Sequence, residues 1–210
     1  MKRFANLVSI ICHPLLMMTY GVLLALSYTY LAIYPTTLKM YMIAAVVLCT
    51  VIAPSMVVVL MVRHGNAGDL ELSRKGERVI PYLVFMAGNM ACFFFYYKLN
   101  MPAWLLSMFA GVSIALLFAL CINFVWKISA HAMGIGGLLG AVMGASYVQM
   151  SNPYSLFVAM ILLAGLTCTS RVILGKHTLM QLLCGFLLGF ASTFITLILN
   201  VSYLFIPKNI

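Results

Sequence analysis

Long apolar runs constrain this chain more than any other feature of its sequence. A membrane-spanning helix needs roughly 20 mostly apolar residues, and seven runs approach or exceed that length. They are Leu7–Ile33, Tyr41–Val62, Pro81–Tyr97, Pro102–Trp126, Ala132–Tyr147, Pro153–Thr169 and Thr178–Ile206. Because 65% of the 210 residues are apolar and only 7% are charged, a water-soluble domain could not bury this surface. The sequence therefore predicts an all-α, polytopic transmembrane helical bundle of about seven spans, or six if the first or the fifth run does not cross.

The runs follow one another with short connections, so we expect one integral-membrane domain over residues 1–210. Residues 1–70 would hold N-terminal spans, and residues 71–210 would hold a core that carries the polar motifs. The first run is predicted to be a retained anchor, because no small-residue cleavage site of a signal peptide follows it. The expected location is the inner cell membrane, crossed several times.

The charged residues are strongly unbalanced, with 12 Lys and Arg against three acids and a net charge of +9. The three acids, Asp69, Glu71 and Glu77, fall in one loop, which argues against paired-carboxylate catalysis and a carboxylate-held metal. No zinc-type spacing of His and Cys occurs, so no metal or other cofactor is expected. Because the basic residues flank apolar runs, the expected partners are membrane lipids rather than nucleic acid. No feature of the sequence sets an oligomeric state.

Three polar segments alternate with the last spans, so counting the crossings places all three on one membrane face. They are residues 63–80, the segment "KISAH" (127–131) and the segment "SRVILGKH" (170–177). Helix N-termini carry free N–H groups and about half a positive charge, which attracts anions. The polar side chains beside these three helix starts are Arg78, Ser129, His131, Arg171 and His177. Together they predict a site for an anion such as phosphate, which arginine can bind with two hydrogen bonds.

The same segments resemble the motifs of the type 2 phosphatidic acid phosphatase family. "SRVILGKHTLMQ" (Ser170–Gln181) is similar to the family's Ser-Arg, five residues, His, three residues, Asp. "ISAH" (Ile128–His131) looks like its Pro-Ser-Gly-His, and "RKGERVIP" (Arg74–Pro81) looks like a loose form of its Lys, six residues, Arg-Pro. The resemblance covers roughly Arg74 to the C-terminus and keeps the family's motif order.

The resemblance implies a role for each matching residue. His177 would be the nucleophile that attacks phosphorus, and His131 would be the general acid that protonates the leaving group. Arg171, Arg78 and Ser129 would bind the phosphoryl oxygens. The family's lysine would be replaced by Lys75 or Arg74, with Ser170 in a supporting position. Lys127 matches no family motif; it could contact a phosphate, or it could be a membrane anchor whose charge extends to the headgroups.

Gln181 stands where the family has an aspartate that orients the nucleophilic histidine. His177 and Gln181 are four residues apart, which on one helix face would let the amide oxygen accept a hydrogen bond from Nδ1. A neutral amide stabilises an imidazolium less than a carboxylate does. Ile128 in place of proline, and two residues between Arg78 and Pro81, are further departures.

Two functions remain open on these residues. The first is a metal-independent lipid phosphatase that hydrolyses a lipid phosphate or diphosphate through a phosphohistidine. Candidate substrates are polyprenyl diphosphate, phosphatidate, phosphatidylglycerol phosphate and a lipid A phosphate. The alternative, motivated by Gln181, is a protein of the same fold that binds or moves phospholipid headgroups without turnover. His13 is predicted to be a packed or interfacial histidine, and His64 a loop histidine.

The membrane face of the site also has two interpretations. Seven spans put nine of the 12 basic residues on the site face and leave Lys39, Lys98 and Lys208 on the other. The positive-inside rule would make the richer face cytoplasmic. The family resemblance instead implies a site outside the cytoplasm, where the arginines are present for phosphate.

Overall fold

The apolar runs form helices that lie side by side in an all-α bundle. The computed structural model describes residues 1–69, 72 and 76–200. Within these residues seven helical segments are long and apolar enough to cross a membrane. Their bounds are Lys2–Tyr28, Thr36–Arg63, Gly76–Lys98, Ala103–Val125, Ala130–Val148, Tyr154–Ile173 and Leu179–Ile198. The prediction of a polytopic bundle is confirmed, with seven spans rather than six, and the chain is a multi-pass membrane protein.

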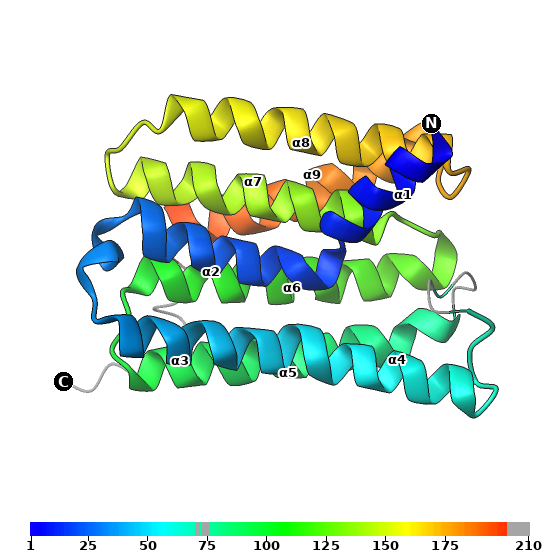
Figure 1. The fold of residues 1–210 in the computed structure, drawn as a ribbon, viewed down its shortest axis with the longest axis horizontal. Helices are drawn as coiled ribbons and strands as arrows, with labels where there is room; N and C mark the ends of the chain where they lie inside the picture. The colour runs from blue at the N-terminus through cyan, green and yellow to red at the C-terminus, as the bar shows by residue number, and fades with distance from the viewer. Residues whose placement is uncertain (70–71, 73–75, 201–210) are drawn as a thin grey trace.

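The first two spans are interrupted helices. The first comprises α1 (Lys2–Ile11), a 3-10 turn η1 (Pro14–Leu16) and α2 (Met17–Tyr28). The break comes at His13, whose Nδ1 accepts a hydrogen bond from the backbone N–H of Leu15 and so caps the turn that Pro14 begins. A second 3-10 turn, η2 (Tyr30–Ile33), follows α2. The first predicted run therefore consists of two helices that meet at an angle (Figure 1).

The second span comprises α3 (Thr36–Val46), a π-helical turn η3 (Val47–Ile52) and α4 (Ala53–Arg63). The wide turn comes directly before Pro54, which lacks the N–H that a regular helix would use there. The remaining spans are α5 (Val79–Lys98, preceded by the turn η4, Gly76–Arg78), α6 (Ala103–Val125), α7 (Ala130–Val148), α8 (Tyr154–Ile173) and α9 (Leu179–Ile198).

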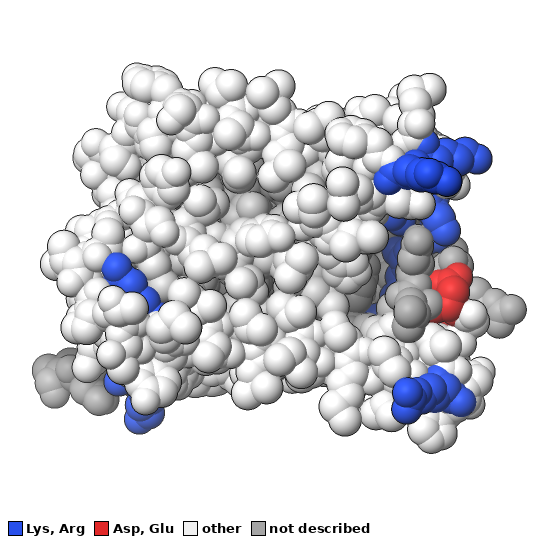
Figure 2. Space-filling model, viewed as in Figure 1, with Lys and Arg blue, Asp and Glu red and all other residues white. Residues whose placement is uncertain are grey.

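The connections divide between the two ends of the bundle. One end holds the N-terminus and the α4–α5, α6–α7 and α8–α9 connections, and we call it the site end (Figure 1). The opposite end holds the α2–α3, α5–α6 and α7–α8 connections. In Figure 2 Lys and Arg side chains lie at both ends of the visible face, acidic side chains lie at the site end, and the broad middle is without charge. This pattern is that of a protein whose middle lies in the hydrocarbon of a bilayer.

Candidate functional site

Helices α7 and α9 pack backbone against backbone, and this contact brings their first turns together. A Cβ atom on Gly136 would overlap the carbonyl oxygen of Phe186, and one on Gly189 would overlap that of Met133. Glycine lets two helix backbones approach this closely, as in other membrane bundles. At the site end the N–H of Ser129 donates to the carbonyl oxygen of Gln181 over 3.2 Å. The starts of the two helices are therefore fixed side by side.

His177 lies just before α9 rather than on it. The helix begins at Leu179 with Thr178 as its N-cap, so the expectation that His177 and Gln181 share a helix face is wrong. The hydrogen bond expected from their spacing is nevertheless present, with 3.3 Å between Nδ1 of His177 and Oε1 of Gln181. It forms because Thr178 and Gln181 make a capping box, in which the Gln181 side chain folds back toward the start of the helix. In this position Oε1 of Gln181 also accepts a hydrogen bond from the N–H of Thr178.

This bond determines which nitrogen of His177 carries the proton. The Gln181 oxygen that accepts the N–H of Thr178 has no proton to give, so Nδ1 of His177 must be the donor. A neutral His177 then has its lone pair on Nε2. Burial, and then the charges of Arg171, Arg78 and Lys127, lower the pKa of His177 to about 4, whereas the hydrogen bond that His177 donates to Gln181 acts to raise it. His177 is thus a neutral imidazole at pH 7, which is the form that can act as a nucleophile.

Two buried arginines lie beside His177. Arg171 ends α8 and is 5% exposed, and Arg78 precedes α5 and is 6% exposed. The guanidinium of Arg78 donates to two main-chain carbonyl oxygens, from Nε to Leu72 at 2.9 Å and from Nη1 to Ile128 at 3.1 Å. Arg78 therefore ties the start of α5 to the α6–α7 connection. Buried guanidinium groups that are held by neutral oxygens favour an anion in the space that they face.

His131, in the first turn of α7, contacts the N-terminal helix. Its Nε2 lies 3.1 Å from the carbonyl oxygen of Ser9 and 3.2 Å from the Ser9 hydroxyl. Because a carbonyl oxygen can only accept, Nε2 of His131 carries a proton. The Ser9 hydroxyl also accepts a hydrogen bond from Nη1 of Arg171 at 2.7 Å. The ring of His13 meets the ring of His131 edge to face, with 5.4 Å between the centroids.

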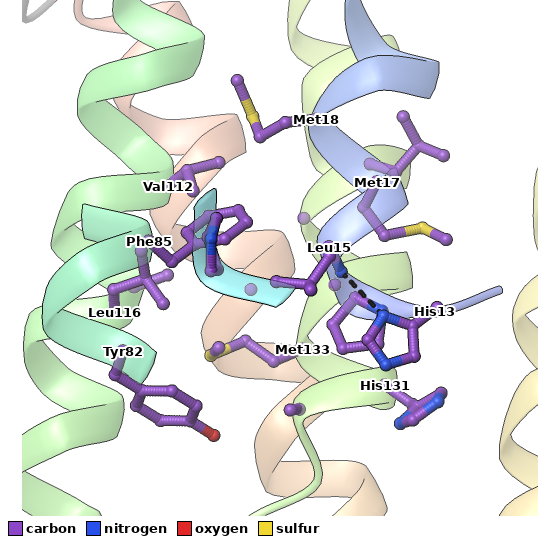
Figure 3. A pocket seen from close by; sticks show the side chains of 18 of the residues that line it. His13, Leu15, Met17, Met18, Tyr82, Phe85, Val112, Leu116, His131 and Met133 are labelled. Carbon is purple, nitrogen blue, oxygen red and sulfur yellow. Dashed lines mark hydrogen bonds between the residues drawn. The ribbon is translucent and has the colours of Figure 1, made fainter. Parts of the chain in front are cut away.

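These groups line one cavity of about 270 Å³ that extends inward from the site end. Its polar lining consists of Ser9, His13, Arg78, Tyr82, His131, Arg171, His177 and Thr193. Figure 3 shows His13, His131 and Tyr82 toward one end of the cavity, with Met18 and Val112 at the other. The Tyr82 hydroxyl oxygen is buried and makes no hydrogen bond within the described part of the chain. A phosphoryl group in the cavity would meet two arginines and two histidines at once.

The other predicted site residues that the structure describes do not line the cavity. The Ser129 hydroxyl accepts the N–H of Ala132 over 3.3 Å, so this fully buried residue caps α7 and is not among the residues that line the cavity. Ser170 is buried in the last turn of α8. Lys127 is half-buried, and burial and then the charges of Arg78, Arg171 and Lys176 lower its pKa, while Asp69 raises it. Arg74 and Lys75 lie outside the described residues.

Sequence reasoning missed four polar residues of the cavity, namely Ser9, His13, Tyr82 and Thr193. Ser9 and Tyr82 lie within apolar runs and match no motif, so neither gave a signal. His13 was interpreted as a packed or interfacial histidine because it stands alone beside Pro14. The interruption of the first run at His13-Pro14 was the available signal, since a broken span at the surface of a bundle often lines a functional space.

Neither the models of known protein families, nor curated proteins, nor solved structures match this chain at a significant level. The site must therefore be interpreted from its own chemistry. Within the described residues no group of three or more His, Cys, Asp and Glu side chains has the arrangement of a metal site.

Proposed function

We propose that this protein is a metal-independent membrane phosphatase that hydrolyses a lipid phosphate or diphosphate through a phosphohistidine intermediate. One observation carries the proposal: His177, His131, Arg171 and Arg78 come from three separate polar segments and line the same cavity. Ordinary interfacial basic residues point outward to water and headgroups, whereas both arginines here are buried. The motif resemblance supports the same chemistry independently of this geometry.

Each group has a role in such a reaction. Nε2 of His177 attacks phosphorus, and the bond from phosphorus to the lipid oxygen breaks on the opposite side. His131, with both ring nitrogens protonated when substrate is bound, gives the leaving oxygen the Nε2 proton that Ser9 accepts in the resting site, and becomes a neutral imidazole. Arg171 and Arg78 neutralise the equatorial oxygens, which is the main requirement of phosphoryl transfer. Water then attacks the phosphohistidine, gives its proton to His131, and releases phosphate and neutral His177.

The position of the cavity supports a lipid substrate. Its polar residues lie at the site end of the bundle, at the level where membrane headgroups lie, and its apolar walls continue between the spans. A lipid could therefore place its phosphate among the arginines without leaving the membrane. We also propose the inner cell membrane as the location.

The direct test is phosphate release from lipid phosphates by the purified protein in detergent, with and without EDTA. Wild type is expected to release phosphate in both conditions, and His177→Ala is expected to release none although it folds. Equal release by His177→Ala, or release that depends on added magnesium, would overturn the proposal. Saturable headgroup binding without any release would instead favour a lipid-binding or lipid-transport protein.

A further inference from the structure

The same cavity has a long apolar part that the phosphoryl chemistry does not use. Farther from the site end than the histidines, the walls of the cavity come from α2, α4, α5, α6, α7 and α9. The lining there includes Met18, Phe85, Met108, Val112, Leu116 and Ala141. Most of these side chains are buried in the centre of the bundle, so the space is surrounded by spans rather than being a groove on the outer surface.

The depth of this apolar part approaches that of one leaflet of a bilayer. Along α7 the apolar lining below His131 runs from Met133 to Ala141, which at 1.5 Å per residue is a depth of about 12 Å. The hydrocarbon core of a bilayer is about 30 Å thick, so half of it belongs to each leaflet. A lipid whose phosphate lies among the arginines could therefore place a hydrocarbon chain in the cavity at its ordinary membrane depth.

Met108 forms the floor of the cavity. A Cβ atom on Gly21 would lie 3.1 Å from the sulfur of Met108, so α2 and α6 close the space at that level. Met17, Met18 and Met133 also contribute to the lining. Methionine side chains are flexible and polarizable, and they adapt to apolar ligands of varied shape.

We propose that the cavity binds one hydrocarbon chain, so that the substrates are phosphates or diphosphates of single-chain lipid alcohols rather than diacyl lipid phosphates. This inference rests on the proposed function and specifies its substrate class. A second acyl chain would need another apolar space that borders the site. The smaller cavity, of about 40 Å³, is bordered by Trp104 and Gln149 toward the opposite end and contains none of the site residues.

The test uses a homologous series of n-alkyl and prenyl monophosphates, together with a diacylglycerol phosphate, in one detergent. At a fixed mole fraction in the micelle, kcat/KM for wild type should rise with chain length and stop rising once the cavity is full; the rise per methylene should be smaller than the about four-fold (~0.8 kcal/mol) of a transfer from water, because the chain leaves detergent hydrocarbon. Met108→Ala, which lowers the floor, should move this limit to longer chains by roughly two or three methylenes, the length of side chain removed. Leu117→Ala is the matched control, because Leu117 is on the same helix but 51% exposed on its outer side.

A second variant should act in the opposite direction. A Cβ atom on Gly137, which lines the cavity, would meet its nearest neighbour only at 3.7 Å, so Gly137→Ala adds a methyl group to the wall without moving the backbone. It should move the limit to shorter chains. An unchanged limit in both variants, or diacylglycerol phosphate as good a substrate as the best single-chain phosphate, would overturn the inference while leaving the phosphatase proposal intact.

Thermal stabilisation of the protein by the same alkyl phosphates tests the chain site without turnover. If no phosphate is hydrolysed, the proposed function fails, and chain-length-dependent stabilisation that shifts in Met108→Ala would still support the chain site. Stabilisation that is independent of chain length would overturn it.

Discussion

The two ends of the bundle carry basic residues in opposite ways. At the site end Arg78 and Arg171 are almost completely buried and point into a cavity. At the opposite end Lys98 is exposed, and Lys39 donates to the carbonyl oxygen of Ala32 at the surface. The lysines have the arrangement expected of membrane anchors, which keep their charge in water. The arginines do not, since burying a charge costs free energy unless something compensates it.

This difference shows how one bundle can build a site at one end only. The glycine contacts of α7 and α9 bring His131 and His177 together, and the hydrogen bonds of Arg78 join the start of α5 to the same place. At the opposite end Trp104 donates to the hydroxyl of Tyr30, and among the described residues no Lys, Arg or His lines the smaller cavity that Trp104 borders. The contrast predicts that equal changes in charge at the two ends have very unequal effects on activity.

The largest difference in activity between the two ends is expected between Arg171→Ala and Lys98→Ala. Removing a charge that stabilises the transferring phosphoryl group should lower kcat by about 10²–10³-fold, whereas Lys98→Ala should leave it unchanged. Single-turnover phosphate release measures both. Equal losses in the two variants would mean that the buried arginine has no special role.

A smaller effect is expected at Gln181. Gln181→Asp places a carboxylate where the amide accepts Nδ1 of His177, and a charged hydrogen bond contributes roughly 1.5–3 kcal/mol against about 1 for a neutral one. The chemical step should therefore accelerate by up to about tenfold, and Gln181→Leu should slow it. Identical single-turnover rates for Gln, Asp and Leu would show that this side chain does not orient His177.

Tyr82→Phe should separate activity from stability. The buried hydroxyl lies beside the Arg78 side chain without a hydrogen bond of good geometry among the described residues, so its removal should change the melting temperature little. If the phosphoryl group or the leaving oxygen is its partner, KM should rise by roughly five- to tenfold, as for the loss of one hydrogen bond of about 1 kcal/mol. A stable variant with unchanged KM and kcat would exclude Tyr82 from the substrate site.

The smallest expected effect concerns pH. Because the pKa of His177 is about 4, the nucleophile stays neutral down to about pH 5. Protonation of His177 should therefore lower kcat/KM only below about pH 5. Between the ordinary histidine pKa of about 6.5 and this value, the unfolded chain binds a proton that the folded chain does not, so folding stability should fall as pH falls.

Lys127→Ala removes one of the charges that lower the pKa of His177, and should move the acid limb of the kcat/KM profile upward by a fraction of a pH unit. An acid limb that does not move would contradict this placement of Lys127.

The sequence was sufficient to predict the spans and the residues that converge, because apolar length and the alternation of crossings depend only on residue order. All seven predicted runs overlap spans, and Arg78, His131, Arg171 and His177 do line one cavity. The exact residues at which the helices begin were less predictable. The capping box of Thr178 and Gln181 begins α9 after His177, and such a cap depends on side-chain geometry.

The contribution of α1 could not be predicted from the sequence. Ser9 is 162 residues from Arg171 along the chain and has no charge or motif to mark it, yet its hydroxyl accepts a hydrogen bond from that arginine. Only the packing of α1 on α8, after the break at His13-Pro14, brings the two residues together. Long-range contacts between apolar helices leave no periodic pattern from which they could be inferred.

The central claim is that His177 receives the phosphoryl group, and mass spectrometry after rapid mixing with a lipid phosphate tests it most directly. Under alkaline quench, which preserves phosphohistidine, the account predicts a phosphoryl group on the peptide that contains His177, formed before phosphate release. Arg171→Ala should form this adduct more slowly, and His177→Ala should not form it at all. Steady phosphate release with no adduct on His177, or with an adduct on another residue, would contradict the account.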